Sequence, residues 1–195
     1  MKSKSNKYAV LAGVFLLLYS LPNLLIHTEG LLSGYPLEIS ELPQLGYIVT
    51  LPLAALFLIL RKPRYVAVCM TISAVLAMLI YLPDIPRYLH DVPDYLSPDI
   101  PPLYALLPVL YALEMILFAL ALYLRGKGAL LVALLAAVTD LAAAKLQFAA
   151  FAYVTGHPSP LNLLLPFNFI LAAIFTGLYL LSPEKHASPR GDISE

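Results

Sequence analysis

Apolar residues form six long and nearly uninterrupted runs along the chain. A helix that crosses the hydrocarbon core of a bilayer needs about 20 such residues, because each adds about 1.5 Å of length. The runs are continuous rather than alternating, which excludes the strands of a membrane β-barrel. The pattern therefore predicts an all-α fold, a bundle of six transmembrane helices in a single membrane domain over residues 1–182. The expected spans are roughly 8–26, 44–60, 64–82, 103–124, 129–154 and 161–181.

Composition supports a membrane location, and the positions of the charged residues predict how the bundle is oriented in the membrane. Of the 195 residues 61% are hydrophobic and 12% charged, too few polar groups to cover a water-soluble globule. Lys2, Lys4, Lys7 and the turns at 61–64 and 125–128 are basic, whereas the linkers 27–43 and 83–102 are mainly acidic. By the positive-inside rule both termini lie in the cytoplasm. We expect a multi-pass protein of the cell membrane, with a solvated tail at 183–195.

Ionisable residues inside the runs are the candidate functional groups. Burying such a group costs about 2.5–3.5 kcal/mol on insertion scales, so it faces the protein interior and marks a site by default. Glu114 and Asp140 lie halfway along the fourth and fifth spans, at matching depth. Lys145 is five residues from Asp140, too far around the helix to pair with it, whereas Gln147 shares the face of Asp140. We predict a solute- or ion-binding site that includes all four residues.

Small residues and prolines suggest where this site opens. Ten alanines between 129 and 152 predict close packing and a central position for the fifth span. Prolines in the outward third of four spans predict kinked helices that splay apart on the outer side. Asn23 and Asn168 lie at that level and complete the list of predicted binding residues. The result would be an outward-facing polar cavity floored by Glu114 and Asp140. The prolines are Pro22, Pro52, Pro108 and Pro166.

The sequence gives little support for a bound metal or cofactor. His27, His90 and His157 fall in outer linkers and are weak candidate metal ligands, with acidic residues nearby but without the spacing of a helical metal motif. No histidine lies within the spans, so a haem held between helices is not expected, and we predict no cofactor. The neutral net charge gives no reason to expect nucleic acid as a partner.

Three functions remain open. The first is a small proton- or cation-coupled transporter in which Glu114 and Asp140 bind the coupling ion. The second is a non-catalytic subunit or assembly factor whose partners are other membrane subunits and whose buried charges fix helix packing. The third is an intramembrane lipid-modifying enzyme, although no nucleophile motif or phosphate-binding loop is present. The lipid bilayer is a partner in all three.

Overall fold

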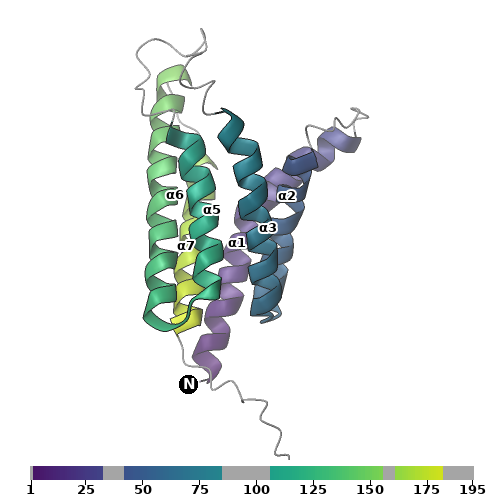
Figure 1. Ribbon diagram of the computed structural model, residues 1–195. Coiled ribbons are helices and arrows are strands. Elements are labelled where there is room, and N and C mark those ends of the chain that lie inside the picture. The colour runs from purple at the N-terminus through teal and green to yellow at the C-terminus, as the bar shows by residue number, and fades with distance from the viewer. Residues whose placement is uncertain (1, 33–41, 85–105, 156–160, 182–195) are drawn as a thin grey trace, which may run out of the picture.

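The described part of the chain forms six long helices (Figure 1). The computed structural model describes residues 2–32, 42–84, 106–155 and 161–181, and these residues contain no strand. The all-α prediction is therefore confirmed, and the predicted tail at 183–195 lies outside the described residues. The helices are α1 Lys2–Leu32, α2 Leu42–Ile59, α3 Pro63–Tyr81, α5 Leu107–Tyr123, α6 Gly126–Thr155 and α7 Leu161–Leu181, with a short 3-10 turn η2 at Leu82–Asp84.

Proline begins helices as well as interrupting them. Pro22, Pro52 and Pro166 lie inside α1, α2 and α7, as the sequence predicts. Pro108 lies in the first turn of α5, because α5 begins at Leu107 rather than near residue 103. Its missing N–H falls in the first turn, where no intrahelical partner exists, so it starts the helix without breaking it. The expected kink at Pro108 is therefore wrong.

The helices form an elongated ring. Each packs mainly against its two neighbours in the order α1, α2, α3, α5, α6, α7, and α7 closes the ring onto α1. Helix α6 therefore lies at one end of the ring and is not central. Its buried face is rich in alanine, whereas leucine and valine project from its outer face, where Val138 is 61% exposed. The many alanines of α6 therefore indicate close packing against its two neighbours, α5 and α7. They do not mean that other helices surround α6 on all sides.

Two glycines allow helices to approach very closely. A Cβ atom placed on Gly13 of α1 would lie 2.6 Å from the carbonyl oxygen of Ala55 in α2. A Cβ atom on Gly177 of α7 would lie 3.0 Å from the Cβ of Ala133 in α6. Contacts between small residues bring backbones together in this way in membrane helices. They hold together the pairs of helices at the two ends of the ring.

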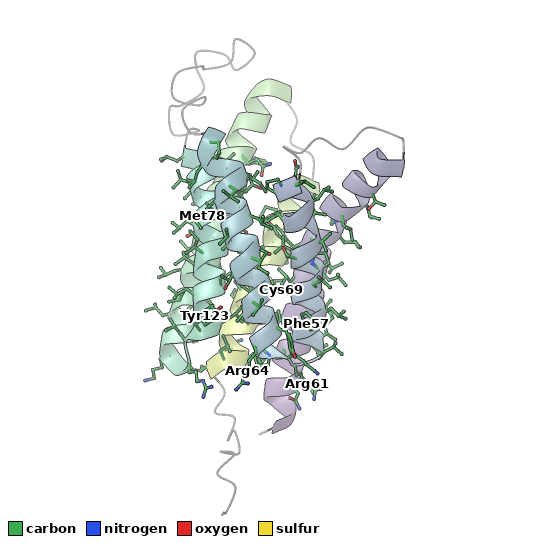
Figure 2. All side chains as sticks on the ribbon, turned by 45° about the vertical axis from the view of Figure 1, so that its right-hand side comes forward. Phe57, Arg61, Arg64, Cys69, Met78 and Tyr123 are labelled. Atoms are coloured by element: carbon green, nitrogen blue, oxygen red, sulfur yellow. The ribbon has the colours of Figure 1, made fainter. Side chains whose placement is uncertain are left out.

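The bundle is apolar on the outside as well as in its core. Large hydrophobic side chains project outward along the helices (Figure 2), among them Leu56, Val75 and Leu135, each close to half exposed. Among the described residues three helices, α2, α3 and the 126–148 part of α6, are long and apolar enough to cross a membrane. Basic residues gather at the end where α1 begins, in the α2–α3 and α5–α6 turns.

Candidate functional site

Glu114 and Asp140 meet inside the bundle. Both side chains are buried, with exposures of 0% and 2%, and their carboxyl groups are in hydrogen-bonding contact across the α5–α6 interface. Among the described residues no basic side chain acts on either group. If both were ionised, Glu114 Oε2 and Asp140 Oδ2 would find no donor among these residues. The structure thus brings together two groups that the sequence places halfway along neighbouring spans.

A chain of hydroxyl groups connects this carboxyl pair to the other half of the ring. The hydroxyl of Tyr19 in α1 donates to Glu114 Oε1 over 3.5 Å. The hydroxyl of Tyr47 in α2 lies near that of Tyr19. Side chains from α2, α1, α5 and α6 thus form one line of polar groups through an otherwise apolar interior. Each hydroxyl can both accept and donate a hydrogen bond, so it can adapt to either protonation state of the carboxyl pair.

A second group of polar residues lies on the side of the carboxyl pair away from the basic end. The Tyr111 hydroxyl, one helical turn before Glu114 on α5, donates to Gln147 Oε1 of α6 over 2.9 Å. The ring of Tyr81, the last residue of α3, packs against Tyr111 with centroids 5.3 Å apart. The predicted binding residue Gln147 therefore belongs to a cluster next to the carboxyl pair, held by tyrosine rather than by Asp140.

Aromatic and aliphatic side chains close the site toward the basic end. Phe118 follows Glu114 by one turn of α5, about 6 Å along the axis. Its ring packs against Phe169 of α7 with centroids 5.5 Å apart, and both rings are buried. Tyr19 also packs against Phe169, at 5.1 Å. The carboxyl pair thus has polar neighbours on one side and an apolar layer on the other.

The remaining predicted site residues are not brought to this pair. Lys145 is exposed on α6 and lies outside the cluster. Asn168 is half-buried on α7, next to Phe169. The side chains of Asn23 and His27, and all of His90 and His157, lie outside the described residues. Among the residues that the structure describes, no group of His, Cys, Asp and Glu could hold a metal ion.

Four tyrosines of the site were not predicted. Tyr19, Tyr47, Tyr81 and Tyr111 come from four helices, and no local pattern relates them. Tyr19 and Tyr111 carry a usable signal, because each lies well inside an apolar run, where a hydroxyl group must find a partner. Tyr47 and Tyr81 lie near the ends of their runs, as tyrosines of a membrane interface also do. Their convergence is a tertiary property.

Two carboxyl groups in contact have limited chemical options. A hydrogen bond between them requires a proton on one of the two, since ionised carboxylates only accept. A bound cation that takes oxygens from both groups is the alternative to that proton. The site can therefore alternate between a protonated and a cation-bound form, or gain and lose a proton. Neither carboxyl group is open to solvent in this conformation, so the expected open cavity does not reach them.

In comparisons with known proteins no family model, no curated protein and no solved structure matches this chain. The function is therefore argued from the geometry of the site alone.

Proposed function

We propose that this protein spans the cell membrane six times with both termini in the cytoplasm. Support comes from the apolar outer surface, which a water-soluble monomer would not expose over so many helices. Further support comes from the alternating direction of the helices and from the basic residues at a single end (Figure 1). Arg61, Arg64, Arg125 and Lys127 belong to that end, and positive residues are retained on the cytoplasmic side.

Within this bundle, the Glu114–Asp140 pair is the coupling site of a small proton- or cation-dependent transporter. The observation that carries this proposal is the contact between two buried carboxyl groups on which no basic side chain acts. A structural network would be expected to offset its buried charge with a fixed basic partner. Here no fixed basic partner is present among the described residues, so a mobile proton or cation, the coupling ion, would neutralise the negative charge of the pair. A proton or small cation fits between the two carboxyl groups. The transported solute would enter the bundle when the helices move apart.

The arrangement of the neighbours favours access from the side opposite the basic end. Tyr81, Tyr111 and Gln147 provide polar groups on that side, whereas Phe118 and Phe169 separate the pair from the basic end. Pro166 lies in the half of α7 that faces the polar side, and Pro52 lies just past the midpoint of α2. Movement of α7 about Pro166 would expose the carboxyl pair to the outer face first. The transporter is thus expected to accept its coupling ion from outside.

Flux through proteoliposomes tests this function. Purified protein is reconstituted with a pH-sensitive dye inside, and internal pH is followed after an imposed pH or sodium gradient. Wild-type protein should carry a flux that falls at least about tenfold in Glu114→Gln and in Asp140→Asn, since each variant loses an ionisable oxygen of the pair. Thr139→Val is the matched control, because the Thr139 hydroxyl donates to Leu135 O of its own helix over 2.9 Å. Fluxes that are equal in all four proteins would contradict the proposal.

One observation favours a second function, that of a membrane subunit or assembly partner. The pair joins α5 to α6, and through Tyr19 it reaches α1, so it contributes to the arrangement of the bundle. A protein of this kind would purify from mild detergent with stoichiometric membrane partners and would carry no flux. Isolation of the chain alone, with flux, favours the transporter.

A further inference from the structure

A groove lies at the basic end of the bundle, between the start of α1 and the end of α2. It has a volume of about 550 Å³ and is lined by Asn6, Lys7, Val10, Leu11 and Arg61. Two cationic side chains and one amide therefore meet two aliphatic side chains in a single open groove. It is separate from the Glu114–Asp140 pair, which lies deeper and is closed off from solvent.

The backbone at Arg61 gives an independent reason to regard this groove as functional. Arg61 has a φ of 57°, the left-handed conformation that favours glycine. It ends α2 in a Schellman motif, in which Lys62 N–H donates to Phe57 O over 2.9 Å and Arg61 N–H to Leu58 O over 3.0 Å. Glycine is the usual residue there and costs less. An arginine at this position gives up some stability, and its side chain lines the groove. Figure 2 shows Arg61 at this end of the bundle, near Arg64.

An apolar path continues from the groove along α1. Leu11, Val14 and Leu18 are exposed and spaced three and four residues apart, so they share one face of the helix. Lys7 precedes Leu11 by one turn on that same face. A cationic groove that leads into an exposed apolar stripe matches a molecule with an anionic head and a hydrocarbon chain. A free anion would have no use for the stripe.

We infer that this groove binds the phosphate headgroup of an anionic phospholipid, with an acyl chain along Leu11, Val14 and Leu18. Arginine can contact two phosphate oxygens at once, and lysine adds a second positive charge. Basic residues between helices on the cytoplasmic side are the usual lipid-headgroup sites of membrane proteins. The inference rests on the proposed membrane insertion but not on the carboxyl pair.

Native mass spectrometry of the detergent-purified protein tests this site. Phosphatidylglycerol, phosphatidylcholine and inorganic phosphate are titrated separately against the full chain. We expect phosphatidylglycerol to bind more tightly than phosphatidylcholine. Its affinity should fall about fivefold in Lys7→Gln and in Arg61→Gly, and more in the double variant. Arg61→Gly is informative because glycine suits the left-handed turn, so thermal stability should be kept or raised while lipid affinity falls.

The matched control is Arg125→Gln with Lys127→Gln, which removes two charges from the same end of the bundle at the other turn. Affinity for phosphatidylglycerol should then stay within about twofold of wild type. An equal loss in this control would mean general charge attraction and would overturn the site. Unchanged affinity in the double variant of Lys7 and Arg61 would overturn it as well. Inorganic phosphate that binds as tightly as the lipid would assign the groove to a free anion. Failure of this lipid site would leave the flux through the carboxyl pair unaffected.

Discussion

At the scale of single residues, the burial of Glu114 and Asp140 is the most costly feature of this molecule. Two carboxyl groups in an apolar interior repel each other when both are ionised, and no basic side chain acts on them among the described residues. A proton shared between them, supported by the Tyr19 hydroxyl, turns that repulsion into a hydrogen bond. The pair is therefore stable only together with an exchangeable ion.

The contact between the two carboxyl groups predicts a measurable coupling. Glu114→Gln and Asp140→Asn keep the side-chain sizes but change the donors and acceptors, so their effects on the free energy of unfolding should not add. We expect an interaction energy of about 0.5–3 kcal/mol in a double-mutant cycle. Reversible unfolding in mixed micelles provides the measurement. Effects that add within experimental error would place the two carboxyl groups apart.

Loss of the Tyr111–Gln147 hydrogen bond should have a smaller effect on stability. Tyr111→Phe removes the hydroxyl that donates to Gln147 Oε1 and keeps the ring packed against Tyr81. The free energy of unfolding should fall by about 0.5–1.5 kcal/mol. Tyr65→Phe, at an exposed position of α3, serves as the control and should change it little. If both variants were equally stable, this hydrogen bond would add nothing to the fold.

At the scale of helices, close contacts between small residues set the arrangement. Gly13 lets α1 lie directly against the backbone of α2, and Gly177 does the same for α7 and α6. The exposed faces of these helices carry leucine and valine, which suit lipid but hold no helix partner in place. The shape of the ring therefore depends on a few positions without bulky side chains.

Gly13→Ala tests this dependence. The added methyl group would lie 2.6 Å from Ala55 O and from Ile59 Cγ1, so α1 and α2 must separate. We expect a loss of about 1–3 kcal/mol in the free energy of unfolding. In Gly128→Ala, the control, no atom lies within 4 Å of the new methyl group. Its stability should stay the same or rise by up to about 1 kcal/mol. Equal stability of the two variants would mean that the α1–α2 approach is not close.

The positions of the helices along the chain were largely predictable from the sequence. Which helices pack against one another was not. Continuous apolar runs and basic turns located all six helices to within a few residues, except at both ends of α1 and at the start of α5. Matching depth brought Glu114 and Asp140 together correctly. The position of α6 in the ring depends on which faces pack, and ten alanines cannot specify that. Lys145 was included in the site because it is ionisable and lies within an apolar run, but its side chain is exposed on α6.

At the scale of the whole molecule, the alternating helices place the two ends of the bundle on opposite sides of the proposed membrane. Leu82 lies beyond the end of α3, and Arg125 lies in the α5–α6 turn at the basic end, both exposed. In a Cys69→Ala background, an impermeant thiol reagent should label Leu82→Cys on intact cells and Arg125→Cys only after permeabilisation. Labelling of Arg125→Cys on intact cells would reverse the topology.

The central claim is that Glu114 and Asp140 share an exchangeable ion, and infrared spectroscopy of the carboxyl groups tests it most directly. The account predicts a hydrogen-bonded, protonated carboxyl band in the purified protein at neutral pH. This band should disappear reversibly when the pH is raised or a bound cation replaces the proton. It should also be lost or shifted in Glu114→Gln and Asp140→Asn, and stay unchanged in Thr139→Val. A spectrum without such a band under any condition, or a band that both carboxyl variants leave unchanged, would contradict the account.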